Sequence, residues 1–246
     1  TWLSLFLADN IIIKEYHQYI KVKKYKNIIK KTLFLKNCIP VNTDFSKRKK
    51  EIDFLYLNAI VNYRHVDDFV YSLKRLSDEN IKFNSNIVGF TMLLNNNNKR
   101  NARDLDYEKY ILSLLKEHLN YNKNINIYAF TKDTHSFFKK AKYFVLPADI
   151  IFVNYALLEA MSFGVVPIVY NGEGVEKIIK HGVNGFICNK GVDNLVETLK
   201  NAMKIPEEEY FKLSYNAFNT IKENFNIKKW IADLENFRNN NYNEVH

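Results

Sequence analysis

The sequence predicts an α/β fold in which helices cover both faces of a doubly wound parallel sheet. From Asp53 onward, short apolar runs alternate with stretches of helical periodicity, which is typical of βαβ units. Of the 246 residues, 47% are hydrophobic, including 18 Phe and 16 Tyr, which is enough for a substantial core. A globally disordered chain is therefore excluded.

Short apolar runs predict the strands of this sheet. They are expected at residues 54–57, 87–90, 125–130, 143–146, 165–169 and 186–187. Helical spacing of apolar residues predicts the helices between and after them. These are expected at residues 66–78, 105–119, 134–141, 155–163, 175–180 and 192–203, from Pro206 onward, and at 227–237. The polar insert 94–101 is expected to be an exposed loop, and the tail at 239–241 to fray.

Local signals mark several helix ends. Gly164 is placed as a terminator of the helix at 155–163. Asp133 or Thr134 is suited to cap the next helix upstream, and Pro206 suits a first helical turn.

The first 45 residues follow a different pattern. Strand-like runs at 10–13 and 32–35 flank a basic helix expected at 15–29, and residues 40–44 are expected to be a linker. We therefore expect three parts, at 1–45, 46–225 and 226–246. Because the sequence does not begin with Met, we expect a fragment or a processed product.

The net charge of +9 is concentrated at residues 21–31 and 47–50. Such charge suits nucleic acid, anionic lipid headgroups or a phosphate-bearing substrate, but it is equally typical of a solvated lysine-rich face. No aromatic and basic nucleic-acid motif accompanies it, so no nucleic-acid partner is expected. A peripheral contact with anionic membrane stays open.

Cysteine usage and hydropathy bear on location. Cys38 and Cys188 form neither a disulfide framework nor a zinc pattern, which favours a reducing cytoplasm. No run of 18 apolar residues is present, and the apolar stretch at 2–8 lacks the charged flank of a signal peptide.

The stretch 143–187 carries the strongest functional signal. A strand ends at Pro147, a loop follows, a helix carries Leu-Glu-Ala-Met at 158–161, and a Gly-x-x-Pro turn at 164–167 leads into another strand. This order is similar to that of the glycosyl transferases group 1 family, which consists of retaining enzymes of the GT-B architecture. Similar segments elsewhere are Lys36–Ile39, Phe54–Arg64, Gly172–Gly174 and His181–Ile187.

The resemblance implies a Rossmann-like sheet, that of the GT-B C-terminal domain, preceded at 1–45 by the end of the N-terminal domain and its linker. It also implies an activity: transfer of a sugar, as in hexosyltransferases, from a nucleotide diphosphate-sugar to a hydroxyl of a glycan, lipid or protein. No metal and no other cofactor are implied. The expected active site lies between two domains, so this chain alone is expected to supply the donor-binding half and to be inactive if nothing else completes it.

Physical reasoning and the resemblance together give a candidate site. The helix start at Asn154 and Tyr155 offers free N–H groups to a diphosphate, although Asn154 could also be only an N-cap. Glu159 could accept hydrogen bonds from ribose hydroxyls, and Arg64 could face the leaving diphosphate. The alternatives are an ordinary helix carboxylate and a solvated loop arginine. Three further residues complete the predicted nucleotide-sugar-binding set: Asn58, Phe130 and Thr131.

Other chemistry-bearing residues are assigned structural roles. His65 and His135 have no partner at a metal-ligand spacing. The sequence Asp104-Leu105-Asp106 mimics a metal-binding Asp-x-Asp motif but follows a polar insert instead of a strand, so we expect it to cap a helix. No metal site is predicted.

The sequence departs from the family pattern where substrate recognition is expected. Ile151 stands at the position of the family's sugar-contacting Glu, and Ala59 at that of its first basic residue. Phe152 and Asn154 replace loop glycines, which reduces backbone freedom. Asp149 could substitute for the lost Glu if the loop is rearranged. The alternative function is therefore a catalytically degenerate GT-B domain that acts as a binding or scaffold module.

Overall fold

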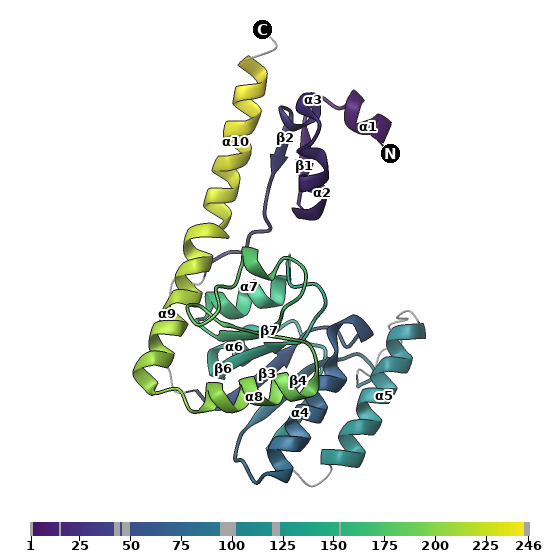
Figure 1. The fold of residues 1–246 in the computed structure, drawn as a ribbon, viewed down its shortest axis with the longest axis vertical. Coiled ribbons are helices and arrows are strands. Elements are labelled where there is room, and N and C mark those ends of the chain that lie inside the picture. The colour runs from purple at the N-terminus through teal and green to yellow at the C-terminus, as the bar shows by residue number, and fades with distance from the viewer. Residues whose placement is uncertain are drawn as a thin grey trace.

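The computed structural model of the protein describes residues 2–14, 16–41, 45, 50–93, 102–119, 124–152 and 154–243. Its main element is a six-stranded sheet in which all neighbouring strands are parallel (Figure 1). The strands are β3 (Ile52–Leu57), β4 (Ser85–Phe90), β5 (Ile125–Ala129), β6 (Ala141–Leu146), β7 (Val166–Tyr170) and β8 (Phe186–Cys188). The predicted α/β fold with a parallel sheet is confirmed.

The strand order is β5-β4-β3-β6-β7-β8. The chain moves outward from β3 to β4 and β5, and then returns to place β6 on the other side of β3. The sheet is thus doubly wound, with a topological switch point between β3 and β6. In open sheets of this kind, ligands bind outside the carboxyl ends of the strands at that point.

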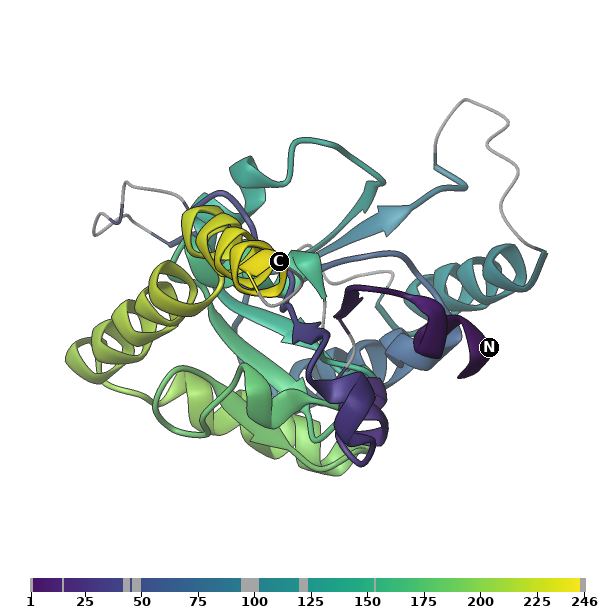
Figure 2. The ribbon, with the colours of Figure 1, turned by 90° about the horizontal axis from the view of Figure 1, so that it is seen from above.

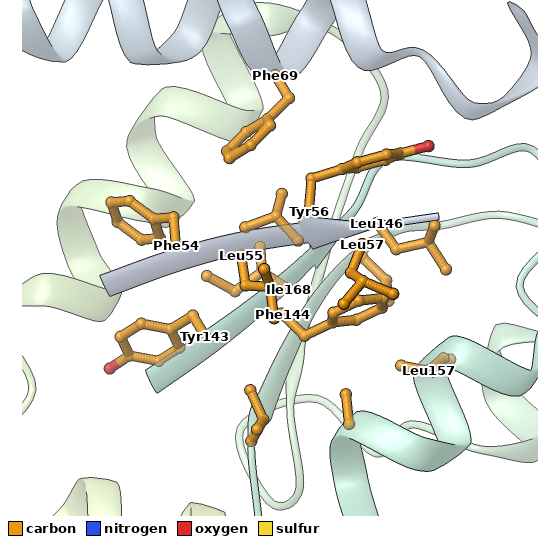
Figure 3. Packing of buried hydrophobic residues seen from close by; sticks show 14 of the residues in the cluster. Phe54, Leu55, Tyr56, Leu57, Phe69, Tyr143, Phe144, Leu146, Leu157 and Ile168 are labelled. Carbon is orange, nitrogen blue, oxygen red and sulfur yellow. The ribbon is translucent and has the colours of Figure 1, made fainter. Parts of the chain in front are cut away.

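Helices cover both faces of the sheet. Those that follow β3 are η1 (Asn62–Arg64), α4 (Val66–Asp78), α5 (Ala102–Leu119), α6 (His135–Lys140), α7 (Tyr155–Ser162), η2 (Val175–Lys177), α8 (Val192–Met203), α9 (Glu207–Asn224) and α10 (Ile227–Asn243). α4 packs against α5 and α8, and α7 packs against α9. Phe69 of α4 and Leu157 of α7 approach β3 and its neighbours from opposite sides (Figure 3).

The core lies on both sides of the central strands. β4 and β7 are buried at every residue, as expected of parallel strands covered on both faces. Phe54 of β3 and Tyr143 of β6 are fully buried neighbours, and the Tyr143 hydroxyl donates to the Ala202 carbonyl at 2.6 Å. The buried hydroxyl is therefore satisfied by the end of α8, which fixes that helix on the sheet.

The N-terminal unit, defined here as residues 2–14 and 16–41, has its own small core. It contains α1 (Trp2–Leu7), β1 (Ile11–Ile13), α2 (Tyr16–Val22), α3 (Lys26–Ile29) and β2 (Thr32–Phe34), and β1 pairs with β2 in parallel. Ile11, Ile13, Val22 and Ile28 form the core. The unit lies beside α10, which extends away from the sheet in Figure 1 and is seen nearly end-on in Figure 2.

Several predicted elements have different bounds. The helix expected at 15–29 is interrupted, because Tyr25 has an extended backbone (φ −108°, ψ 100°). Val22 and Ile28 are six residues apart, so one straight helix would turn them to different sides; the break lets both enter the core. The start predicted at Glu15 lies outside the described residues.

Three further helix predictions were also wrong in extent. The helix expected at 175–180 is only the short η2, because Ile178 leaves the helical region (φ −124°, ψ −46°). α10 continues to Asn243, so the tail at 239–241 is helical, as propagation from a formed helix allows. α5 begins at Ala102, before the predicted start. The polar insert at 94–101 lies outside the described residues.

Candidate functional site

Two predicted site residues meet at the topological switch point. Asn58 directly follows β3, and Asn154 lies at the end of the loop that follows β6. The Asn58 amide nitrogen Nδ2 donates to Asn154 Oδ1 at 3.2 Å, across 96 residues of sequence. Asn58 Oδ1 also accepts from the Ala59 N–H at 2.9 Å, which fixes the orientation of the amide. The carboxyl ends of β3 and β6 are thus joined where a ligand of such a sheet would bind.

Gly89 allows this arrangement at the end of β3. It has φ 135°, and a Cβ atom there would lie 1.9 Å from the Asn58 carbonyl oxygen. Glycine is therefore required in β4 because the backbone of the site residue approaches it directly.

Asn154 is the N-cap of α7, as predicted. Its backbone is extended (φ −78°, ψ 108°), and its Oδ1 accepts from the Leu157 N–H at 3.1 Å. The first-turn N–H groups of an α-helix have no partner within the helix, and the cap takes only that of Leu157. Those of Tyr155 and Ala156 have no acceptor among the described residues. Together with the helix dipole, they make the start of α7 suited to an anion.

The loop that leads into α7 is held by a neighbouring loop. The N–H groups of Ile151 and Phe152 both donate to the Glu173 carbonyl, at 3.0 and 3.1 Å. In return, the Glu173 N–H donates to the Asp149 carbonyl at 2.7 Å. The position of the α7 start is therefore set by backbone bonds between two loops at the same edge of the sheet.

Glu159 lies one helical turn into α7 and is half-buried. Its Oε2 accepts from the Thr134 hydroxyl at 3.3 Å. Thr134 ends the turn that contains the predicted residues Phe130 and Thr131. The Phe130 side chain is 48% exposed, and Thr131 Oγ1 accepts from the Asp133 N–H at 3.0 Å. These two residues thus lie after β5, and Thr134 connects their turn to Glu159.

A side chain of the same turn caps the start of α6. Asp133 Oδ1 accepts from the Ser136 N–H at 3.3 Å, so the Asp133 side chain satisfies a first-turn donor. The Thr134 side chain makes no cap bond and is directed to Glu159 instead. Thr134 was not among the predicted site residues, because only the fold brings it next to α7.

Arg64 lies in η1, the short helix that follows β3 along the chain. Its Nη1 donates to the Ala59 carbonyl at 3.1 Å, and its guanidinium lies 5.4 Å from the centre of the Tyr63 ring. The side chain is half-buried, so it is anchored instead of being a freely solvated loop arginine. Arg64 therefore places a permanent positive charge beside the residue pair Asn58 and Ala59.

Asp149 joins three loops at this edge. Its Oδ1 lies 2.9 Å from His65 Nε2 and also pairs with the Lys190 ammonium. Its N–H donates to the Tyr63 carbonyl at 3.0 Å. The hydrogen bond from Lys190, followed by that from His65, holds the pKa of the Asp149 carboxyl below its usual range. The carboxylate is thus already engaged by the Lys190 ammonium and the His65 ring.

His65 was predicted to be structural, and its contact with Asp149 was not foreseen. The two residues are 84 positions apart, and no spacing rule links them. His65 has a left-handed backbone (φ 42°) between η1 and α4, which is uncommon for a residue other than glycine. His135 was also assigned a structural role; its ring lies 4.9 Å from that of Phe163.

The buried side chains of Ile151 and Phe152 make the inward-facing side of the loop apolar. Ile151 is fully buried, and the Phe152 ring stacks on Phe34 of the N-terminal unit at 6.0 Å between ring centres. The same unit reaches the neighbouring loop, where His17 Nδ1 lies 3.0 Å from Glu173 Oε1. The N-terminal unit therefore borders the candidate site.

Within the described residues, no group of three or more His, Cys, Asp or Glu side chains could hold a metal ion. The sequence at 104–106 lies inside α5 instead of ahead of it, and Asp106 pairs with Lys109 at 3.2 Å.

The described helices include none that is long and apolar enough to cross a membrane.

The fold and these contacts define an α/β domain with a candidate ligand site at the switch point of its sheet. The model of the glycosyl transferases group 1 family matches residues 42–220. The chain therefore belongs to the glycosyl transferases group 1 family, whose architecture is GT-B.

Individual relatives agree with this assignment. An uncharacterized glycosyltransferase of Haemophilus influenzae is 25% identical over 128 residues, which cover 51% of this chain and 36% of that protein. The crystal structure of Anabaena Alr3699/HepE in complex with UDP is similar with a TM-score of 0.77 and 12% identity, covering 95% of this chain and 64% of that one.

A third comparison concerns a domain solved alone. The C-terminal domain of the group 1 glycosyl transferase LpcC from Francisella tularensis is similar with a TM-score of 0.59 and 16% identity. The match covers 73% of this chain and 88% of that structure. The identities to the solved structures are low, so these two likenesses show the fold alone. The chain spans about a third of the Haemophilus relative and less than two thirds of the Anabaena protein.

Proposed function

We propose that this chain supplies the donor-binding half of a retaining glycosyltransferase. The whole protein would transfer a hexose from a nucleotide diphosphate-sugar to a hydroxyl of a glycan, lipid or protein. The contact between Asn58 and Asn154 carries the proposal, because it brings the N-terminus of α7 to the switch point of the sheet. The family match at residues 42–220 supports the reaction class.

Each polar group of the site has a role in this proposal. The N–H groups at the start of α7 bind the diphosphate, and Arg64 faces it as negative charge develops on the leaving group. Glu159 accepts hydrogen bonds from ribose hydroxyls, in a position that Thr134 helps to fix. Arg64 and the helix N-terminus thus balance the diphosphate charge without a metal ion.

The identity of the donor is open to a direct test. Crystals of Anabaena Alr3699/HepE contain UDP or UDP-glucose. This makes UDP and UDP-glucose the first ligands to test with the present chain.

The loop before α7 bears on sugar preference. Ile151 stands where the family has a sugar-contacting Glu, and here its side chain is fully buried in the core. Asp149 is tied to His65 and Lys190. We therefore infer that the sugar is recognised differently from the family pattern, while the nucleotide is held by the start of α7 and Glu159.

Replacement of Glu159 tests the nucleotide role. Loss of one hydrogen bond to a charged acceptor removes about 1.5–3 kcal/mol, so UDP should bind Glu159→Ala at least about tenfold more weakly in calorimetry. Glu159→Gln keeps an oxygen that can accept from Thr134 and should lose less. Unchanged affinity of a folded Glu159→Ala variant for every nucleoside diphosphate would remove Glu159 from the site. If no nucleotide-sugar binds the wild-type protein, the scaffold function would replace the proposal.

A further inference from the structure

A second cavity lies between α6 and the amino-terminal halves of β4 and β5. Its volume of about 360 Å³ is near the lower end of the range for small-ligand pockets. The residues that decide its chemistry are Glu51, Asn86, Asn126, Tyr128, Phe137 and Lys140. The candidate site lies at the opposite edge of the sheet, where β3 and β6 end, and the described residues of the N-terminal unit do not line the cavity. The cavity is therefore separate from both.

The cavity exists because α6 is too short to cover this face of the sheet. α6 has six residues, so it is roughly 9 Å long, whereas strands of five or six residues span roughly 16–20 Å. Phe138 of α6 is buried against Phe144 of β6, and Phe137 meets the Tyr128 ring at 5.0 Å between ring centres. The remaining part of β4 and β5, nearer their amino ends, forms the floor of the cavity.

Two asparagines lie side by side on this floor. Asn86 of β4 is in register with Asn126 of β5, and Asn126 Nδ2 donates to Asn86 Oδ1 at 3.1 Å. Asn86 Nδ2 and Asn126 Oδ1 have no partner among the described residues. Asn86 is only 6% exposed, yet the described part of the chain has no fully enclosed side-chain nitrogen or oxygen without a partner. Asn86 Nδ2 therefore reaches the cavity, and the pair offers it one donor and one acceptor.

An aromatic wall and a neutral rim complete the cavity. Tyr128 follows Asn126 by two residues on the same face of β5 and is 39% exposed. At the rim, the Lys140 ammonium lies 3.4 Å from Glu51 Oε2, so these two charges balance each other. An anionic or cationic ligand would find no unpaired opposite charge among these residues, and placing it there would cost desolvation. The cavity therefore suits a ligand that is polar but uncharged.

We propose that this cavity binds a neutral sugar unit of a glycan. Neighbouring hydroxyls of a sugar ring can each donate and accept, which matches Asn86 Nδ2 and Asn126 Oδ1. The C–H face of the same ring is apolar and can lie on the exposed Tyr128 ring. The inference does not depend on the proposed transfer reaction, because none of these residues belongs to the candidate site.

Titration calorimetry with three neutral trisaccharides tests the inference on the full chain. The probes are maltotriose, mannotriose and chitotriose, and at least one of them should bind the wild-type protein. Asn126→Ala removes one hydrogen bond between uncharged groups, and Tyr128→Ala removes the aromatic surface. Each change should weaken that binding by about 2- to 12-fold. Circular dichroism should show both variants folded, because both side chains are exposed.

Matched controls separate this cavity from the rest of the molecule. Asn201→Ala replaces an exposed asparagine of α8 and should leave trisaccharide binding unchanged. Saturating UDP should not displace the trisaccharide, because the nucleotide is expected at the other edge of the sheet. Four results would each overturn the inference: no binding of any trisaccharide, equal affinity in the wild type and both cavity variants, displacement by UDP, or uridine binding that is tighter than that of the trisaccharides and is weakened by Asn126→Ala.

Discussion

Replacing Asn154 by Asp separates the structural role of this residue from its role in binding. The carboxylate can accept from the Leu157 N–H and from Asn58 Nδ2, as the amide oxygen does at 3.1 and 3.2 Å. Asp and Asn are equally good N-caps, and a negative charge at a helix N-terminus contributes about 0.3–1 kcal/mol of stability. The free energy of unfolding of Asn154→Asp should therefore equal or slightly exceed that of the wild type.

Nucleotide binding should respond in the opposite direction. A diphosphate bound at the start of α7 would lie close to the new carboxylate. Two unit charges roughly 6 Å apart repel by about 3 kcal/mol at an effective dielectric constant of about 20. Asn154 is only half-buried, so solvent screening reduces this to about 1.5–2.5 kcal/mol. UDP should then bind roughly 10- to 100-fold more weakly.

Titration calorimetry with UDP, paired with urea unfolding, measures both effects. Asn201→Asp, an exposed residue of α8, is the matched control for added charge and should bind UDP like the wild type. The reasoning is refuted if Asn154→Asp is folded and binds UDP with wild-type affinity, because the diphosphate would then lie elsewhere.

Two further predictions concern the support of the site. Gly89→Ala should lower the free energy of unfolding by about 3 kcal/mol or more in urea denaturation, since its Cβ would lie 1.9 Å from the Asn58 carbonyl. Gly182→Ala, with φ 72° but open space around it, should cost only about 1 kcal/mol, and equal losses would contradict the clash. The folded-state pKa of Asp149 is lowered, chiefly by Lys190, so its stabilising effect should be full above the unfolded value of about 3.9 and be lost as pH falls through the folded value. Asp149→Asn should therefore be less stable than the wild type at neutral pH, and this gap should shrink as pH falls below about 3.9. A gap that is constant with pH would exclude this ion-pair contribution.

The sequence predicts the sheet well because its signals are local. Runs such as Phe54–Leu57 are apolar throughout, and a strand covered on both faces buries every residue of such a run. Helix ends marked by a single residue were also found, as at Asn154. The length of a helix was predicted less well where tertiary packing decides where it ends. The break at Tyr25 follows from a core that needs both Val22 and Ile28.

The candidate site could be located from the sequence, but its contacts could not. Asn154 was predicted from its place at the start of a helix, and Asn58 belongs to the family-like segment Phe54–Arg64. Their hydrogen bond, in contrast, depends on β3 and β6 being neighbours. Two further contacts also depend on how the fold brings distant residues together. They are the contact of Thr134 with Glu159 and that of Asp149 with His65. Whether Phe130, Thr131 and Arg64 contact the donor stays a prediction.

A thermal-shift panel of UDP-, GDP-, ADP- and TDP-sugars tests the central claim most directly. A ligand that binds only the folded state raises its stability, by about 2.7 kcal/mol when present at a hundred times its Kd. We expect one nucleotide to raise the Tm of the wild type clearly, and to raise that of Asn154→Asp and Glu159→Ala much less. A panel in which no nucleotide-sugar changes the Tm of the wild-type protein would contradict the proposal of a donor-binding domain.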